Sequence, residues 1–448
     1  MFDDMDAAIR YIFRTRRRLD AAPRGLDEYT RDTAPTRSLL AGAGLLHRER
    51  DYVVVTGSRG KGSVTAIMAK LLQAQGRRVG TVTSPHLVHW NERIRVDGRM
   101  IPTDRFLGIL GDLRPAIDGI LGRLDAAHYL SPQGIFLAIA LRYFDEMGVD
   151  LAVLEVGRGG RFDDIAVVPN RLSVFAPVML EHTALLGDTL GRIAWHKAGI
   201  IKAGGAAISL PQAPDALAEL RREADKQAAD LICLSDADMG EWLADSADGQ
   251  HLRLPPYGEL TLPLLGRYQI ENATLAIRAV ELLRKSSGAL PAAYKETIRR
   301  GLSAVRWPGR VQQLDEAPAV YVDGAITRRS AQSFLASVAP RLRQPVISIV
   351  GVPRDRDYAG VYRVMGAVSQ ALIITETDIN PNTRFPDRSA ALDAACGLTS
   401  EQCHTYKLSE ALELARSLAG ETGTILMAVS LMLVGECMLI WDVHTSAI

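Results

Sequence analysis

Short apolar runs alternate along the chain with longer segments of helical spacing. The run 53–56 is rich in β-branched residues and predicts a buried strand, and apolar side chains recur at helical spacing over 64–72. A glycine-rich turn, 57–63, joins the two. A strand, a glycine-rich turn and a helix in this order predict the first unit of a β–α alternation.

Further apolar runs extend this alternation to about residue 300. The runs 151–156 and 172–178 are almost continuously apolar, which is typical of strands buried on both faces of a parallel sheet. Helix-forming sequence covers 104–147, broken at Ser131-Pro132, and resumes at Leu190. The N-terminal part therefore predicts an α/β domain with a doubly wound, mostly parallel sheet, in which ligands bind outside the carboxyl ends of the strands.

A polar loop follows the next predicted strand, 78–83. Residues 94–101, IRVDGRMI, predict a hairpin that turns at Asp97-Gly98. The loop that begins at Ser84 is therefore expected to be held at both ends.

A second alternation begins near residue 319. Its predicted strands are 319–322, 346–350, 371–375 and 424–429. We place N-terminal helices and the P-loop domain in 1–303, a linker in 304–318 and a smaller, Rossmann-like α/β domain in 319–448.

Composition excludes several classes of protein. The 448 residues are 47% hydrophobic, and 52 basic residues balance 52 acidic ones, so the positive charge of a nucleic-acid-binding protein is missing. Four cysteines show no metal-site spacing, and acidic residues after Met1 replace the basic start of a signal peptide. Because Gly435 and Glu436 interrupt the apolar segment 424–441, a strand and a buried helix fit it better than a membrane span. We expect a cytoplasmic protein without a nucleic-acid or membrane partner.

The glycine-rich turn has the chemistry of a nucleotide-triphosphate site. Its residues are Gly57, Ser58, Arg59, Gly60, Lys61, Gly62 and Ser63. Glycines let backbone N–H groups close around phosphate oxygens, Lys61 reaches the terminal phosphates, and the Ser63 hydroxyl can meet Mg²⁺. The strict Walker pattern is not met, because Val55 stands in place of its first glycine and Gly62 separates the lysine from the hydroxyl. An ordinary glycine-rich turn is the alternative interpretation.

Polar residues also gather at two other predicted strand ends, 155–163 and 181–183. Glu155 is a candidate Mg²⁺ ligand or a cap of the next turn, and His182 taken singly fits a structural histidine better than a ligand. Their place at the same edge as Ser63 and Ser84 favours the metal site.

Spacing alone leaves the roles of three other polar residues open. Lys197 is a candidate site residue or a solvated helix lysine, and Arg310 contacts a ligand or pins the linker. Asp323 accepts from a ribose hydroxyl or forms a turn.

Eight ordered motifs resemble the Mur ligase superfamily, in its folylpolyglutamate synthase and dihydrofolate synthase branch, over nearly the whole chain. They are TGSRGKGS (56–63), TSPHLVHWNERIRVDG (83–98), LEVGRGGRFD (154–163), EHTALLGDTLGRIAWHKAGI (181–200), LLGRYQIENA (264–273), WPGR (307–310), VDGA (322–325) and VSLMLVGE (429–436). Eight motifs in order are far more specific than one P-loop.

This resemblance implies a Mur-ligase-like central ATPase domain and an ATP-dependent ligase that joins a carboxylate to an amine. The turn Gly57–Ser63 would cradle ATP, and Asn272, Arg310 and Asp323 would make further ATP contacts, with Asp323 at the ribose. An acid acceptor, pterin-type or another small acid, would be activated as an acyl phosphate and joined to an amino acid, which we expect to be glutamate. We expect a monomer, with a dimer as the alternative.

The resemblance also implies a metal site with two Mg²⁺ ions. Ser84, Glu155 and His182 match the family's Mg²⁺ ligands, beside Ser63. Lys197 matches a lysine that the family carbamylates with CO₂, which turns a cation that would repel the metal into an anionic ligand. The predicted catalytic residues are thus Lys61, Glu155, His182 and Lys197.

The sequence departs from the family at substrate positions. The usual DGAHN motif reads DGAIT, 323–327, and 131–136 lack an aromatic-Glu pair in the acceptor region. The usual Arg-Pro-Asn-Asn-Pro-Arg motif is altered over 378–384. Three alternatives therefore stay open: a ligase for a non-folate acid, a poly-γ-glutamate-type chain extension, and a nucleotide-binding regulatory subunit without catalysis. A P-loop kinase for a small molecule is a fourth.

Overall fold

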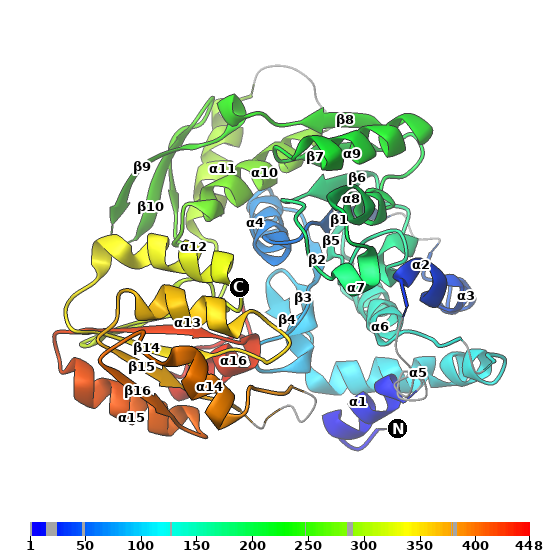
Figure 1. Ribbon diagram of the computed structural model, residues 1–448. Helices are drawn as coiled ribbons and strands as arrows, with labels where there is room; N and C mark the ends of the chain where they lie inside the picture. Colours follow the sequence, from blue (N-terminus) through cyan, green and yellow to red (C-terminus); the bar gives the residue numbers. More distant parts are fainter. Residues whose placement is uncertain are drawn as a thin grey trace.

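A computed structural model of the chain describes residues 2–14, 25–46, 50–125, 128–246, 248–284, 290–377, 379 and 383–448 (Figure 1). Within them lie three sheets. The first is central to the N-terminal part, the second is a small antiparallel sheet, and the third belongs to the C-terminal part.

The first sheet has eight strands in the order β4-β3-β2-β5-β1-β6-β7-β8. Their bounds are β1 Asp51–Thr56, β2 Val79–Val82, β3 Ile94–Val96, β4 Arg99–Met100, β5 Leu151–Glu155, β6 Leu172–Phe175, β7 Ala206–Ser209 and β8 Asp230–Cys233. All neighbours from β2 to β8 in this order pair parallel, whereas β3 and β4 pair antiparallel at one edge. The predicted doubly wound, mostly parallel sheet is confirmed.

Helices cover both faces of this sheet. They are α1 Met5–Phe13, α2 Asp27–Thr30, α3 Ala34–Gly42, α4 Lys61–Ala74, α5 Thr103–Leu121, α6 Pro132–Glu146, α7 Thr183–Leu186, α8 Leu190–Ala198, α9 Pro214–Lys226, α10 Tyr268–Leu282 and α11 Ala292–Ser303. Because side chains alternate across a strand, Tyr52 and Val54 of β1 join the core with α5 and α6, and Val53 and Val55 join the core with α4 and α10. The central strand thus packs into a core on each of its faces from Tyr52 to Val55.

The C-terminal sheet has the order β12-β13-β17-β14-β15-β16, and the small sheet has the order β11-β10-β9. The strands are β9 Glu241–Ser246, β10 Gly249–Leu254, β11 Gly258–Leu262, β12 Gln312–Glu316, β13 Ala319–Asp323, β14 Val346–Gly351, β15 Ala371–Ile374, β16 Glu401–His404 and β17 Thr424–Val429. The C-terminal helices are α12 Arg328–Val338, α13 Tyr358–Gly366, α14 Arg388–Ala395, α15 Leu408–Ala419 and α16 Leu431–Ile440. The predicted second α/β alternation is present.

Local predictions differ in outcome. The hairpin at Asp97-Gly98 is confirmed, with both residues at positive φ, 48° and 79°. In contrast, β12 and β16 were not predicted, because the polar sequence QQLDE and the mostly half-buried EQCH carry little apolar signal. The division at 304–318 stays a prediction, and β12 begins inside that interval and pairs with β13.

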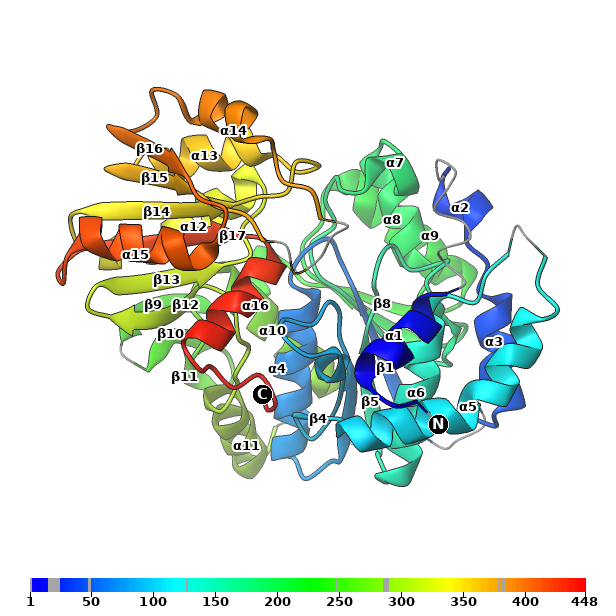
Figure 2. The ribbon, with the colours of Figure 1, turned by 90° about the horizontal axis from the view of Figure 1, so that it is seen from below.

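The chain returns to the first sheet at its end. After α16 the last residues run from the C-terminal part to the β3–β4 hairpin, and two views place the C-terminus there (Figures 1 and 2). The segment 424–441 forms β17 and α16, as expected. In the part of the chain that the structure describes, no helix has the length and apolar character needed to cross a bilayer.

Candidate active site

The glycine-rich turn leads from β1 directly into α4. Gly60 is the residue before the helix and has φ 79°, a left-handed conformation that glycine adopts without a Cβ clash. Ser58 ties the turn to the loop after β6, since its hydroxyl donates to Met179 O at 3.0 Å. The N-terminus of α4 and its free backbone N–H groups therefore face the carboxyl ends of the strands, where phosphate oxygens can bind.

Gly60 also brings α10 against the turn. A Cβ at Gly60 would collide with Oδ1 of Asn272, so only glycine permits this approach. Asn272 is 3% exposed and donates to Gln269 Oε1 at 2.9 Å. Asn272, predicted to contact ATP, thus lies at the turn predicted to bind its phosphates.

Glu155 lies at the end of β5, next to β1. It is paired in register with Val55, and its Oε2 accepts the backbone N–H of Ser84 at 3.0 Å. Burial raises the pKa of Glu155, and the nearby cation of Lys61 only partly offsets this effect. A buried carboxylate of this kind gains free energy from a bound cation, so the pair of Ser84 and Glu155 fits a Mg²⁺ site.

Lys197 lies within α8 and reaches the same place from another side. Its side chain is fully buried, and Nζ donates to Glu181 Oε1 at 2.8 Å and to Gly57 O at 2.9 Å. Burial lowers the pKa of Lys197 to about 8, a net value in which Glu181 opposes the shift and the cation of Lys61 adds to it. A buried lysine with a lowered pKa is the form of amine that reacts with CO₂, so Lys197 fits the predicted carbamate.

His182 is half-buried and precedes α7 with φ 48°. Burial lowers its pKa, which favours the neutral imidazole that binds metals. Its charged neighbours include Glu181, Arg158 and Lys197. The structure thus places His182 beside Lys197 at the end that holds the P-loop.

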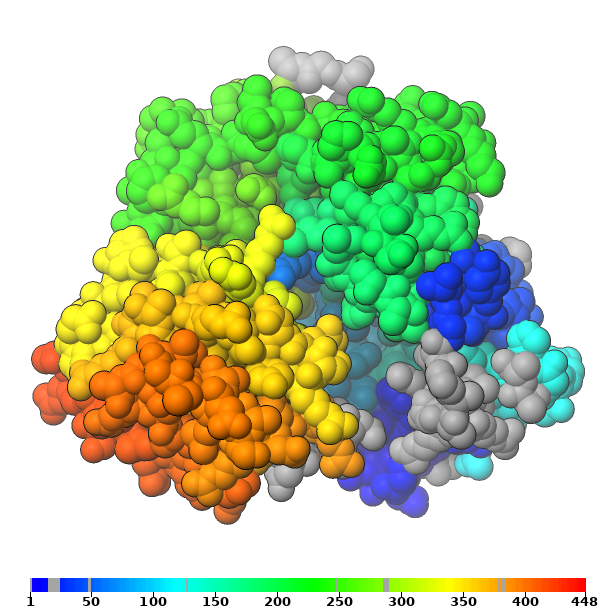
Figure 3. All heavy atoms as spheres, in the orientation of Figure 1, coloured from blue at the N-terminus to red at the C-terminus, as the bar shows by residue number. Residues whose placement is uncertain are grey.

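The C-terminal part supplies the other side of the site. Asp323 ends β13, is buried, and accepts the N–H of Val311 at 2.9 Å. Burial raises its pKa, whereas Arg310 and Arg59 lower it. Arg59 of the glycine-rich turn donates to Thr327 Oγ1 at 2.6 Å, so the two parts are already joined. A space-filling view shows a hollow between the C-terminal part and residues near 180, with atoms of the early chain at its base (Figure 3).

Sequence reasoning missed several charged neighbours. Glu181 pairs with Lys197, and Arg93 lies near Glu155 in the interior. Both stand in motifs that the sequence analysis quoted, and their place at a strand end or in a loop was the signal. Among the described residues no group of three or more His, Cys, Asp or Glu side chains could hold a metal. The metal ligands implied by the family resemblance, which include serine hydroxyls and a lysine, stay a prediction.

The structure shows where two of the three altered family motifs lie. Thr327 caps α12 by accepting the N–H of Ser330 and also accepts from Arg59, so the position is occupied by internal bonds. Gln133 lies in the first turn of α6, whose N-cap is Ser131. Of the altered segment 378–384, residues 378 and 380–382 lie outside the described residues.

Known proteins resemble this chain closely. No protein-family model matches it. The chain is 31% identical over 370 residues to the dihydrofolate synthase/folylpolyglutamate synthase of Bacillus subtilis, with 80% of this chain and 82% of that protein covered.

Two solved structures extend the likeness to the fold. The folylpolyglutamate synthase of Mycobacterium tuberculosis complexed with ADP and AMPPCP has a TM-score of 0.83 at 26% identity, over 97% of this chain and 99% of that one. A folylpolyglutamate synthase complex with AMPPCP and folate has a TM-score of 0.75 at 26% identity, over 96% and 99%. Both match nearly end to end, so the likeness includes the C-terminal part.

Proposed function

The chain belongs to the folylpolyglutamate synthase and dihydrofolate synthase family of the Mur ligase superfamily, and we propose that it uses ATP to join glutamate to the carboxylate of a folate-type acid. It is an ATP-dependent carbon–nitrogen ligase. The relatives named above carry this activity in their names, and one of them binds both AMPPCP and folate.

The observation that carries this proposal is the convergence of two lysines and a buried carboxylate at the glycine-rich turn. Lys61 and Lys197 both donate to Gly57 O, at 3.1 Å and 2.9 Å, and Glu155 lies within electrostatic reach of Lys61. The carbonyl of Gly57 thus holds both lysine side chains at the turn. ATP would draw Lys61 from Gly57 O to the terminal phosphates.

The proposed metal ligands lie at the same edge of the first sheet as the glycine-rich turn. Ser63, Ser84, Glu155 and His182 would hold Mg²⁺, with Lys197 as a carbamate at a second ion. Bound Mg²⁺ neutralises charge on the phosphoryl group that is transferred. Ser84 donates its N–H to one oxygen of Glu155 and so fixes the carboxylate for this role.

In the proposed reaction the acceptor carboxylate attacks the γ-phosphate of ATP, and the products of this step are an acyl phosphate and ADP. Lys61 and the N–H groups at the start of α4 stabilise the charge on the phosphoryl oxygens. The amine of the amino acid then attacks the acyl carbon, phosphate leaves, and the amine proton passes to solvent. Asn272, Arg310 and Asp323 would hold the nucleotide between the two parts, with Asp323 at the ribose.

The experiment is phosphate release by purified protein with ATP and Mg²⁺, over a matrix of acids crossed with amino acids. We expect release only when a folate-type acid and glutamate are both present, with a product lighter than their sum by one water. Release that needs an acid but no amine indicates a kinase or a stalled acyl phosphate. ADP together with a stable phosphorylated product, formed without any amine, contradicts the ligase.

The carbamate has its own test. Lys197→Ala is expected to lose activity that bicarbonate cannot restore and that a small added carboxylate partly restores, because the carboxylate supplies the missing anion. Lys226→Ala, at an exposed lysine on α9, is the control. Full activity of Lys197→Ala would contradict a role for this side chain.

A second candidate is a ligase of the same chemistry for a non-folate acid. The observation that favours it lies in the acceptor region, where 131–136 lack the family's aromatic-Glu pair and Gln133 lies in the first turn of α6. In the matrix experiment this candidate gives release with another acid and none with folates. A ladder of products in the mass spectra would indicate chain extension.

The remaining assignments stay predictions. These are the monomeric state, with a dimer as the alternative, and the cytoplasmic location.

A further inference from the structure

The loop after β2 is embedded in the C-terminal part. This loop, 84–89, begins at Ser84, and its Leu87 and Val88 pack into the core formed by α15, α16 and one face of the C-terminal sheet. α16 approaches so closely that a Cβ on Gly435 would collide with the backbone oxygen of Leu87. The loop therefore belongs to the first sheet by sequence and to the C-terminal core by packing.

Glu92 holds the same loop from the other side. Its carboxylate accepts the backbone N–H groups of Leu87 at 3.0 Å, Val88 at 2.9 Å and His89 at 2.8 Å. Glu92 is only 5% exposed, and three N–H donors to one buried carboxylate are strong, charge-assisted hydrogen bonds. The conformation of the loop thus depends on where this carboxylate lies.

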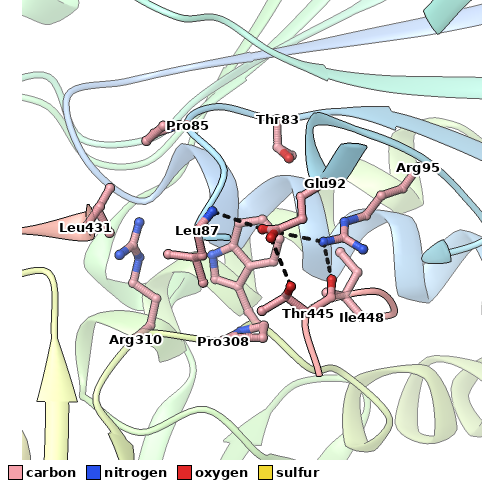
Figure 4. Close-up of a pocket in the computed structure, with 11 residues that line it drawn as sticks. Thr83, Pro85, Leu87, Glu92, Arg95, Pro308, Arg310, Leu431, Thr445 and Ile448 are labelled. Atoms are coloured by element: carbon pink, nitrogen blue, oxygen red, sulfur yellow. Dashed lines mark hydrogen bonds and ion pairs between the residues drawn. The ribbon is translucent and has the colours of Figure 1, made fainter. Parts of the chain in front are cut away.

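The C-terminal residues determine where it lies. Thr445, which follows α16, donates its hydroxyl to Glu92 Oε1 at 2.9 Å in the protein interior. Arg95 approaches Glu92 at 3.9 Å and donates to Thr445 O at 2.6 Å and Ser446 O at 3.0 Å. Figure 4 shows Glu92, Arg95 and Thr445 turned toward one another around a cavity of about 30 Å³ that Thr83 and Arg310 also line.

Backbone bonds fix the same C-terminal residues to the hairpin. Met100 N–H donates to Ser446 O at 2.9 Å, and Ile448 N–H donates to Gly98 O at 3.0 Å. Lys70 of α4 adds a bond from Nζ to Ile448 O at 2.8 Å. Residues 445–448 therefore extend the β3–β4 edge of the first sheet (Figure 2).

We propose that Thr445 and Arg95 are positioning residues that act through Glu92 to hold the loop 84–89, and with it Ser84, in place against Glu155. Ser84 is the first residue of that loop and its N–H is already bonded to Glu155. The chain of contacts is continuous from α16 to the predicted metal site. Only the role of Ser84 as a metal ligand rests on the proposed function.

A coupling between the two parts follows. Any rotation of the C-terminal part that displaces Thr445 or α16 also displaces the N–H groups that bind Glu92, because packed contacts transmit such shifts. The position of the C-terminal part and the geometry of Ser84 and Glu155 therefore change together.

The test is amide hydrogen exchange in Thr445→Val, measured without nucleotide and metal. Valine keeps the shape and removes the hydroxyl that binds the carboxylate. We expect exchange at Leu87, Val88 and His89 to become about tenfold faster, the effect of losing one hydrogen bond to a charged group. Ser446→Ala is the matched control, since Ser446 is the exposed neighbour and contributes its backbone oxygen.

A second variant and a second measurement complete the test. Arg95→Lys keeps the charge but loses the two-pronged geometry of the guanidinium, and it is expected to speed exchange at the same three amides. In both variants the Mg²⁺ concentration for half-maximal phosphate release should rise several-fold, while kcat at saturating Mg²⁺ changes little.

The inference is overturned if exchange at 87–89 is unchanged in both variants. It is equally overturned if exchange rises to the same extent in α4 and the C-terminal sheet, because that result indicates a general loss of stability. A wild-type protein without ligase activity would contradict the proposed function and leave the exchange result intact.

Discussion

Two loops form the predicted phosphate and metal side of the site, and they are held in different ways. The glycine-rich turn 57–63 is fixed by the strand before it, the helix after it and its own positive φ angles. The loop 84–89 is fixed by Glu92 and by Thr445, which lies 353 residues from Glu92 in the sequence. The backbone of the first is restricted mainly by local sequence, with added bonds from Ser58 and Arg59 to distant residues, whereas the second depends on the docking of the C-terminal part.

This difference separates two kinds of mutational effect. Changes at Lys61 and at the glycines of the turn act on the predicted phosphate binding directly, whereas Arg59 of the turn also bonds Thr327 of the C-terminal part. Changes in the contacts of the loop act on the position of the C-terminal part and on Ser84 at once. The predictions below test each side of this comparison.

The largest effect is expected for Lys61→Ala in the turn. Loss of the cation that stabilises phosphoryl charge should lower kcat/KM by about 10³-fold or more. Phosphate release under the conditions of the matrix experiment measures this, and the exposed Lys226→Ala serves as control. Normal turnover of Lys61→Ala would contradict the assignment of the turn.

Gly435→Ala tests the other side, at the contact between α16 and the loop. The added Cβ has no room beside Leu87 O, so α16 or the loop must move, at a cost of about 1–3 kcal/mol in the free energy of unfolding. Denaturant unfolding measures this cost. Gly111→Ala in α5 is the matched control, because a Cβ there meets nothing within 4 Å.

We expect Gly435→Ala to speed amide exchange at Leu87 as well. A variant as stable as Gly111→Ala, with unchanged exchange, would show that the loop does not depend on α16.

Gly60→Ala separates backbone strain from the contact with Asn272. A side chain at φ 79° lowers the free energy of unfolding by about 1 kcal/mol. The collision with Asn272 also displaces the turn, so we expect a several-fold higher KM for ATP. Gly44→Ala carries similar strain at φ 65° but meets nothing within 4 Å. Equal KM values for ATP in the two variants would contradict a role of the close approach to Asn272.

The smallest effect on the reaction is expected away from both loops, at Lys202. Burial, together with the cations of Arg37 and Arg161, lowers the pKa of Lys202 to about 8, although Glu223 opposes the shift. Between about pH 8 and the unfolded value of 10.5 the folded chain has released a proton that the unfolded chain keeps, so the free energy of unfolding rises with pH.

Denaturant unfolding of the wild type and Lys202→Met at pH 7 and pH 10 measures this rise. The wild type should gain stability relative to the variant over that range, and a constant difference would contradict the lowered pKa. The change from pH 7 to pH 10 should not alter the order in which the Gly60 and Gly435 variants rank by free energy of unfolding.

Much of the first sheet and the nucleotide side could be predicted because their signals are local. The apolar run 53–56, the glycines of the turn and the Asp97-Gly98 hairpin each restrict the backbone over a few residues. Polar strands such as β12 and β16 were not predicted, because their sequences lack an apolar alternation. They are strands because they pair with β13 and β15.

The sequence by itself determined the α/β class, the glycine-rich turn and the family motifs, because these rest on short-range periodicity and residue type. Only the tertiary structure decided that Glu181 pairs with Lys197, that Arg59 reaches Thr327, and that Thr445 completes the support of Glu92. The physical reason is that a hydrogen bond between distant residues depends on where the chain brings them, and neither residue alone carries a sign of its partner.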